Sequence, residues 1–405
     1  MEVNLFPERR RLQAVGSSGA FVRGCKYSVV SHRIGIDARM LGTRPKGIGR
    51  YIWELCRGLD KAMPHAEFFL YSRAPIGLPR ISTRWHERVD RAAGARLPNS
   101  LWGAARVGFL ARSDRVNVFW GGTGLVPLIG LEARSVLTVH DLVYSLEPQT
   151  TSIRARWAAR LFFRPSVRKA DYIVCNSHGS ARRLEAFLGR RADAVVHPGV
   201  SDAFRRREHA EVLRVLSRLD VRKPYLLAVG TWEPRKGLQR LIAAFLGLAN
   251  QILLREHTLV LAGARGWKDD AIANAVSSGG DRIRAVGYVD DDSLAALYSG
   301  ADALVFPSIY EGFGIPVLEA RACGTRVVAS DLPELREAGG EGAIYIPPTE
   351  AGIMAGIAQA LASGAPAPLA PHELGWDQRA RTFVPVLTGA IGLSKREARS
   401  MARAC

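Results

Sequence analysis

The chain has 405 residues, of which 47% are hydrophobic, and it carries a formal net charge of +18. This length suffices for two domains of ordinary size, and the hydrophobic content excludes an intrinsically disordered protein. The excess positive charge lies in residues 1–207, where 35 Lys and Arg oppose 16 Asp and Glu, whereas residues 208–405 hold 21 and 22. We therefore expect a basic front domain that attracts anionic lipid, phosphorylated substrates or nucleic acid, although an Arg-rich proteome would produce the same bias.

The cysteines and the hydropathy indicate the compartment. The five cysteines are far apart, odd in number and without a CxxC pair, which argues against a disulfide framework or structural zinc and fits a reducing cytosol. No uninterrupted run of about 18 apolar residues occurs, and the start of the chain lacks the apolar core of a signal peptide. We expect a cytoplasmic protein without a transmembrane helix.

The front of the chain alternates short apolar runs with helical stretches. After an extension at residues 1–31, the first predicted strand covers residues 33–37, and a helix follows from about residue 51 to 59. Further strands are expected at residues 68–71, 116–120, 136–139, 172–175 and 194–196. This alternation predicts a doubly wound parallel α/β sheet in a domain spanning residues 32–207.

Two places in the front domain have residues suited to a ligand. Gly47 and Gly49, flanked by Lys46 and Arg50, follow the first strand, and close glycines let a backbone approach a ligand. The third glycine of a dinucleotide fingerprint is missing. His140 ends a predicted strand, where a side chain reaches the cleft, although a His in such a place is more often a structural hydrogen-bonding residue.

The rear domain, predicted for residues 208–375, opens with a strand at residues 225–229 and the sequence GTWEPRKG. Arg235 and Lys236 lie at a strand-to-helix junction, and a guanidinium fork beside an ammonium is well matched to a diphosphate. Two solvated basic residues at a turn are the alternative. We expect Asp290–Asp292 to cap a helix at residues 293–299. Further strands are predicted at residues 258–261, 283–286, 303–306, 326–329 and 343–346.

The stretch from residue 301 to 324 combines a buried strand, a loop and a helix. Glu311 lies on the loop and Glu319 near the start of the helix, where Pro316 suits the first turn and Gly324 the position past the end. The unpaired N–H groups at the helix start invite an anion, and parallel sheets bind ligands at this end. A ligand with phosphates and hydroxyls, such as a nucleotide sugar, fits. The alternative is a helix cap and a solvated helix residue.

Together the two motifs resemble a known family. The spacing Glu311-x7-Glu319 in the sequence SIYEGFG, with Arg235-Lys236 upstream, resembles the donor site of retaining glycosyltransferases of family four. That family has the GT-B fold, in which two doubly wound parallel-sheet domains face each other across a cleft. The resemblance covers residues 33–387. It implies a crossover helix at residues 376–388 that returns to the front domain, and a basic tail at residues 389–405.

The resemblance also implies an activity. It predicts a hexosyltransferase, similar to bacterial mannosyl- or rhamnosyl-type transferases of surface polysaccharides, that moves a hexose with retention. The donor would be a nucleotide-diphosphate sugar such as GDP-mannose or a UDP-sugar, and no metal or other cofactor would be needed. The acceptor would be a glycan or a lipid-diphosphate-linked glycan, and the basic front domain suggests peripheral contact with the inner membrane face.

In the rear domain the resemblance assigns donor contacts. Glu311 would hold sugar hydroxyls, and Glu319 would accept hydrogen bonds from the ribose. Arg235 and Lys236 would stabilise the leaving diphosphate, together with the start of the helix at Gly314, Ile315 and Pro316.

The remaining contacts implied by the resemblance come from other loops. His140 would contact the transferred sugar, Gly47 and Gly49 would face the diphosphate, and the loop with Tyr288 would surround the nucleobase. Thr231 stands where the family often has an arginine, so Arg235 and Lys236 must supply the phosphate charge.

Three other functions would use some of the same features. A glycosidase also uses two carboxylates but has no need of the Arg-Lys pair. A GT-B sugar-nucleotide epimerase would share the phosphate site but need no acceptor. A nucleic-acid-binding protein would explain the charge, yet the sequence shows no basic stripe interleaved with aromatic residues.

Overall fold

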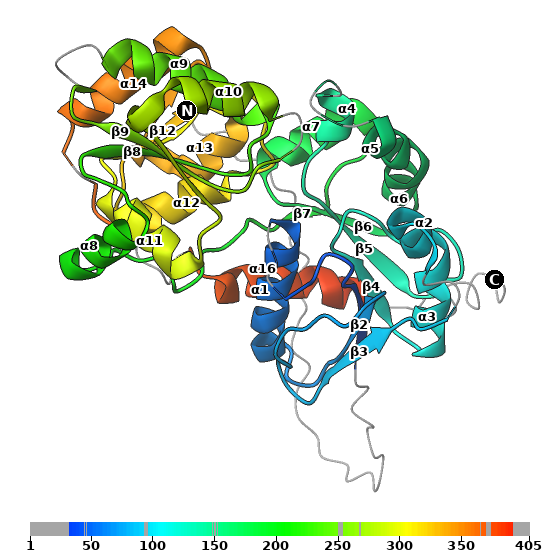
Figure 1. Cartoon of the computed structure of the whole chain (residues 1–405). Helices are drawn as coiled ribbons and strands as arrows, with labels where there is room; N and C mark the ends of the chain where they lie inside the picture. The colour runs from blue at the N-terminus through cyan, green and yellow to red at the C-terminus, as the bar shows by residue number, and fades with distance from the viewer. Residues whose placement is uncertain are drawn as a thin grey trace, which may run out of the picture. The chain divides into compact units, whose positions relative to one another are not determined.

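The computed structural model describes residues 32–391, except 44, 46, 93–95, 148, 150, 152, 250–253, 267–268, 365 and 370–373. The predicted extension at residues 1–31, Lys46 and residues 392–405 of the predicted tail lie outside the described residues. The described chain forms two parallel sheets with helices packed against both faces of each (Figure 1). The predicted pair of doubly wound sheets is therefore confirmed.

The front sheet has seven strands in the order β3-β2-β1-β4-β5-β6-β7. Its strands are β1 (Arg33–Asp37), β2 (Glu67–Ser72), β3 (Trp85–Val89), β4 (Val118–Gly121), β5 (Arg134–Val139), β6 (Tyr172–Cys175) and β7 (Ala194–Val195). Only β3 was not predicted. It is an edge strand with the sequence WHERV, whose polar residues hide the apolar pattern of a buried parallel strand.

Helices cover both faces of the front sheet. On one face α1 (Ile48–Ala62) buries Ile52, Leu55 and Leu59, a helical spacing that places them on one side. The helix begins three residues before the predicted start. The remaining front helices are α2 (Asn99–Leu101), the π-helical turn η2 (Trp102–Arg106), α3 (Val107–Ser113), α4 (Val143–Leu146), α5 (Ile153–Ala158), the π-helical turn η4 (Ala159–Phe163), α6 (Arg164–Lys169) and α7 (His178–Leu188).

The rear sheet has six strands in the order β10-β9-β8-β11-β12-β13. They are β8 (Tyr225–Val229), β9 (Thr258–Ala262), β10 (Ile283–Gly287), β11 (Ala303–Phe306), β12 (Val327–Ser330) and β13 (Ala343–Ile346), each within two residues of its predicted bounds. The rear helices are α8 (His209–Arg218), α9 (Leu238–Ala249), α10 (Asp270–Ser278), α11 (Asp291–Gly300), α12 (Ile315–Ala322), α13 (Pro333–Gly339) and α14 (Glu350–Ala362), with 3-10 turns η5 (Pro234–Lys236), η7 (Gly280–Arg282) and η8 (Gly340–Gly342).

The last helix, α16 (Trp376–Ile391), packs against α1 on the front sheet, as the expected crossover helix would. Trp376, Ala380, Phe383 and Leu387 are buried in the same core as the front strands. The helix continues to Ile391, past the predicted start of the tail at residue 389. Among the described residues, none of the helices is both long and apolar enough for a membrane span.

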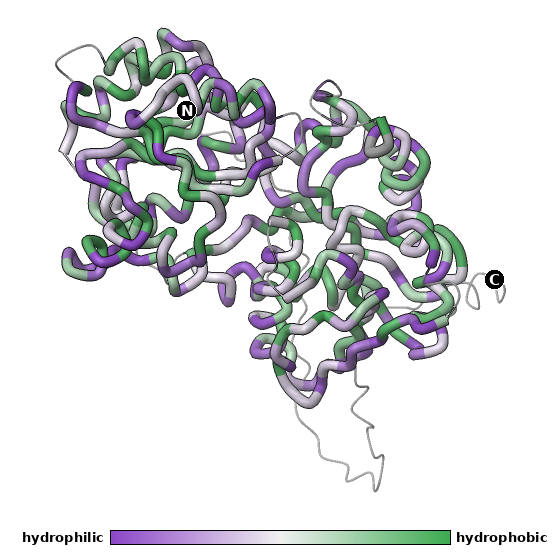
Figure 2. The backbone as a smooth tube through the Cα atoms, in the orientation of Figure 1, coloured by the Kyte–Doolittle hydropathy of each residue, from purple (hydrophilic) through white to green (hydrophobic). Residues whose placement is uncertain are grey.

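Each sheet reverses its strand order at one point, which lies between β1 and β4 in the front sheet and between β8 and β11 in the rear sheet. At such a point the loops after the two strands separate and leave a crevice for a ligand. Hydrophobic residues follow the strands of both sheets, and more polar residues mark many of the connecting loops (Figure 2). The loops after β8 and β11 contain the predicted donor-binding residues.

Candidate functional site

Arg235, Lys236 and Glu311 form one cluster at the reversal point of the rear sheet. The Nζ of Lys236 lies 2.6 Å from Oε1 of Glu311, and Nη1 of Arg235 lies 3.2 Å from Oε2. The two loops also contact each other through their backbones, because Ile309 donates its N–H to the carbonyl of Arg235. A Cβ at Gly237 would lie 2.3 Å from the carbonyl oxygen of Pro307, so only glycine permits this approach.

Burial and charge act against each other in this cluster. Burial lowers the pKa of Lys236 more than Glu311 raises it. For Glu311 burial works to raise the pKa, but the adjacent Lys236 and Arg235 outweigh it and hold the pKa below its usual range. The carboxylate is thus ionised between two cationic groups, with Glu233 paired to Arg235 at 2.8 Å on its outer side. The positive groups are close enough together to grip a diphosphate.

The start of α12 lies between the two predicted carboxylates. Its N-cap residue is Gly314, with φ of 105°, and Pro316 occupies the first turn. No side chain caps this helix end. A Cβ at Gly314 would meet Leu335 at 2.5 Å, so both the backbone angle and the packing require glycine. The uncapped N–H groups give the site a second feature that favours an anion.

Glu319 is buried in α12 with 4% of its surface exposed. The hydroxyl of Tyr298 donates to its Oε2 at 3.1 Å, and Nη1 of Arg50 lies 3.4 Å from its Oε1. Burial raises the pKa of Glu319 to about 7 even though Arg50 opposes the change. The solvated alternative for this residue is excluded, and its charge is sensitive to small changes near neutral pH.

Arg50 connects the predicted glycine loop to the rear half. It follows Gly47, the N-cap of α1 with φ of 49°, and Gly49, whose Cβ would lie 2.3 Å from the carbonyl oxygen of Met40. Its two terminal nitrogens also lie 3.1 and 2.8 Å from the carboxylate oxygens of Asp291. The positive charge here was predicted from the sequence, but these partners were not, because two residues 241 positions apart leave no local signal.

The expected cap of α11 is confirmed. Asp290 accepts a hydrogen bond from the backbone N–H of Ser293 at 2.8 Å. Its neighbours have additional partners, since Asp291 pairs with Arg50 and Asp292 lies 2.7 Å from Arg207. This acidic run therefore also connects α11 with α1 and with the loop before α8.

His140 lies beside the loop that carries Glu311. Its Nε2–H donates to the carbonyl of Gly122 at 2.7 Å, and its ring packs edge-on against Tyr51 with centroids 5.0 Å apart. Burial lowers the pKa of His140, which favours a neutral ring. A Cβ at Gly312 would lie 2.3 Å from the carbonyl oxygen of His140, so the two strand-end loops touch. His140 thus makes the structural hydrogen bond expected of a His at a strand end, and it lies next to the loop that carries Glu311.

Two further predicted residues lie at the edges of the site. Thr231 is exposed in the loop after β8. Tyr288 is 46% exposed and lines a pocket of about 680 Å³ together with Arg50, Trp53 and Asp291. Tyr288 and Arg50 therefore share one pocket, from which Arg50 reaches Glu319.

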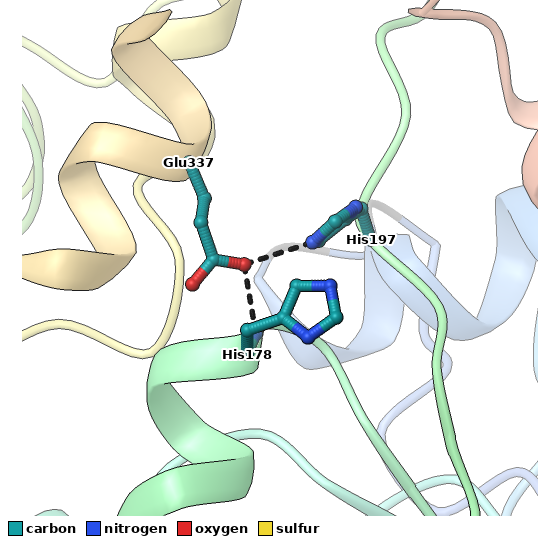
Figure 3. Close-up of side chains that lie close together, drawn as sticks. All are labelled: His178, His197 and Glu337. Carbon is teal, nitrogen blue, oxygen red and sulfur yellow. Dashed lines mark hydrogen bonds and ion pairs between the residues drawn. The ribbon is translucent and has the colours of Figure 1, made fainter. Parts of the chain in front are cut away.

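A second contact between the halves involves Glu337 on α13 (Figure 3). Its carboxylate accepts the backbone N–H groups of His178 and Gly179 at 2.7 and 2.8 Å, and it lies 2.9 Å from Nε2 of His197. Burial would raise the pKa of Glu337, but His197 and the two N–H groups hold it below its usual range. On the same helix Glu334, fully buried, pairs with Arg183 at 3.0 Å.

His178, His197 and Glu337 have the spacing of metal ligands, and among residues 32–391 as described they alone form such a group. Both carboxylate oxygens, however, already accept N–H groups at the start of α7. A cation would lie at the positive end of that helix and compete with its N–H donors. The cluster is best explained as a contact that holds α13 against α7, and the absence of a metal requirement stays a prediction.

Comparison with solved structures confirms the fold. A sucrose-phosphate synthase from Thermosynechococcus elongatus superposes with a TM-score of 0.66 at 20% identity, covering 92% of this chain and 100% of that one. WaaG, a glycosyltransferase involved in lipopolysaccharide biosynthesis, gives 0.61 at 16% identity, covering 90% and 99%. The fold is GT-B, as predicted.

Sequence comparison defines the family. The model of Glycosyltransferase Family 4 matches residues 45–204, and that of Glycosyl transferases group 1 matches residues 211–381. The O-antigen chain mannosyltransferase B of Escherichia coli is 34% identical over 334 residues, which are 78% of this chain and 87% of that protein. A D-inositol 3-phosphate glycosyltransferase of Rhodococcus opacus is 30% identical over 244 residues, 57% of this chain and 50% of that protein. The chain belongs to the group 1 glycosyltransferases of family four and is a glycosyltransferase.

Proposed function

We propose that the chain transfers mannose, with retention, from a nucleotide-diphosphate sugar to a growing surface polysaccharide. The observation that carries the proposal is the cluster of Arg235 and Lys236 around Glu311 at the reversal point of the rear sheet. The choice of mannose is supported by the similarity to a mannosyltransferase of O-antigen chains. GDP-mannose is therefore the first donor to test, with UDP-sugars as comparison.

In this proposal the rear half stabilises the leaving group. As the bond between the sugar and the diphosphate breaks, negative charge grows on the phosphate oxygens. Arg235, Lys236 and the uncapped N–H groups at Gly314 supply fixed positive potential there, without a metal ion. Glu311, released in part from its ion pairs, accepts hydrogen bonds from sugar hydroxyls. The pairs that the cations make with Glu311 hold them in position before the donor arrives.

The other predicted residues would hold the rest of the donor. Ionised Glu319 would accept hydrogen bonds from the ribose hydroxyls, with Arg50 beside it, and Tyr288 would lie at the nucleobase. His140, neutral and fixed by Gly122, would approach the sugar from the front half. The acceptor would be a glycan on a lipid diphosphate, and the basic front half would hold the enzyme at an anionic membrane surface.

The experiment is an assay of mannose transfer and donor hydrolysis with the purified chain, GDP-mannose and a mannose-containing acceptor. We expect Lys236→Ala and Glu311→Ala to lower kcat by about 100-fold or more, the usual cost of losing one group that stabilises developing charge. Lys61→Ala, which removes an exposed lysine of α1, is the matched control. Near wild-type turnover in both site variants would refute the donor site.

Further measurements separate the alternatives. Proton NMR of the anomeric signal in the first product should show the configuration of the donor. A sugar-nucleotide epimerase would instead convert the donor without an acceptor. Turnover should persist after chelation of divalent ions, and its loss, restored by a metal, would contradict metal-free transfer.

A further inference from the structure

The segment of α5, η4 and α6 carries large apolar side chains on its outer face. Ile153 is 64% exposed, and Trp157 and Leu161 are each 57% exposed. A spacing of four residues places them on one face of the helix. In a soluble domain the apolar face of a helix normally packs against the core. Here the face is exposed, and α5 and α6 lie at the edge of the front half (Figure 1).

The same face is cationic. Arg156 and Arg160 lie between the apolar residues and are also exposed. The guanidinium carbon of Arg160 is 5.9 Å from the ring centroid of Trp157. Residues 153–169 contain five Arg and one Lys and no Asp or Glu. Hydrophobic and hydrophilic residues are interspersed along this part of the chain (Figure 2).

The neighbouring helix α7 extends the patch. The ring centroid of Phe187 on α7, a residue 36% exposed, lies 5.0 Å from the guanidinium carbon of Arg164. We call the surface of Ile153, Trp157, Leu161 and Phe187, with the interspersed arginines, the α5 face.

This composition identifies the kind of partner. The centre of a protein interface is depleted of charge, whereas here arginines alternate with the apolar residues along the whole stripe. An anionic bilayer surface matches both, since its headgroups attract the arginines while Trp and aliphatic side chains enter the boundary with the acyl chains. Exposed arginines such as Arg156 and Arg160, in a segment without an acidic residue, are complementary to a surface of one sign.

We propose that the α5 face docks the enzyme on an anionic lipid bilayer. The inference rests on the proposed function, because an acceptor carried by a lipid would have to be met at such a surface. It goes further in assigning the contact to one helical face rather than to the net charge of the front half.

The experiment measures flotation of the full chain with vesicles of phosphatidylglycerol and phosphatidylcholine, and with phosphatidylcholine alone. At about 1 kcal/mol per basic residue near an anionic surface, Arg156→Gln with Arg160→Gln should weaken binding about 30-fold at low salt. Arg214→Gln with Arg222→Gln makes the same charge change on exposed positions of the rear half and is the matched control. It should weaken binding far less.

A second pair of variants tests the apolar contribution. Trp157→Ser should lower binding, and Leu213→Ser, which removes a residue 47% exposed on α8, should leave it unchanged. Three results would each overturn the proposal. The α5-face and control variants could have equal effects, the chain could bind only neutral vesicles, or it could form a concentration-dependent dimer that dissociates in Trp157→Ser. Turnover of a soluble acceptor, measured in parallel, distinguishes the two ideas: if turnover persists while flotation fails, only the docking surface is refuted.

Discussion

Replacement of Tyr298 by Phe tests whether an ionised Glu319 holds the donor. The substitution keeps the ring in the core and removes one hydrogen bond, which the hydroxyl donates to Oε2 of Glu319 at 3.1 Å. That bond favours the charged carboxylate. Burial already raises the pKa of Glu319 to about 7, and loss of this hydrogen bond should raise the pKa further.

The size of the effect follows from the bond. A hydrogen bond to a charged group contributes about 1.5–3 kcal/mol, which corresponds to about one to two pH units. At neutral pH the ionised fraction of Glu319 would fall from about half to about a tenth or less. We expect the donor KM at pH near 7 to rise by about fivefold or more, and the midpoint of its pH dependence to move upward by the same one to two units.

The assay is the initial rate against donor concentration across a pH series, with the dissociation constant of GDP measured in parallel. Tyr225→Phe is the matched control, because its hydroxyl is also buried in the rear half and donates to the carbonyl of Leu297 at 2.7 Å without touching Glu319. If the two variants have the same pH profile, the assignment of Glu319 to the donor is wrong.

Three other predictions concern stability and local order. Glu319 has a pKa of about 7 in the folded state against an ordinary 4.5, so between these pH values the folded state binds a proton that the unfolded state does not. The free energy of unfolding should therefore fall by about 3 kcal/mol as pH rises through this range. In denaturant titrations, Glu319→Gln should lack this fall. Gly314→Ala should lower the midpoint of thermal unfolding and weaken donor binding, since φ of 105° is unfavourable for alanine by about 1–2 kcal/mol, whereas Gly342→Ala, with open space around it, should do neither. Glu337→Ala should speed hydrogen exchange at the first amides of α7 about tenfold or more, because these N–H groups lose a charged acceptor, and unchanged exchange there would refute the contact.

Much of the fold could be predicted because parallel strands are buried on both faces. Runs such as Ala303–Phe306 are apolar throughout, and glycine and proline mark where they end. The exception, β3, lies at the edge of the sheet, where polar residues are tolerated and the pattern disappears. Helix bounds were less accurate: α1 starts at Ile48, since its N-cap is a glycine with positive φ and lacks the Ser, Thr, Asp or Asn that marks most helix starts.

The site could be predicted only in part, for a physical reason. Arg235, Lys236 and Glu311 each lie at a strand end, and the topology of a parallel sheet brings strand ends together. The partners of Arg50 and Glu337 belong to the other half of the chain. Their contacts depend on how two separately formed sheets meet, which no local pattern of residues reports.

The contact between the halves also includes the loop that carries Glu311. The carbonyl of Gly312, next to Glu311, accepts hydrogen bonds from the hydroxyls of Ser177 and Ser180 at 2.7 and 3.2 Å. The hydroxyl of Tyr310, on the other side of Glu311, accepts a hydrogen bond from the backbone N–H of Leu142 at 2.7 Å. The residue proposed to hold the sugar is therefore flanked on both sides by contacts with the front half. We predict that separation of the halves would free this loop, so that a donor that needs Glu311 would be bound productively only while these contacts are in place.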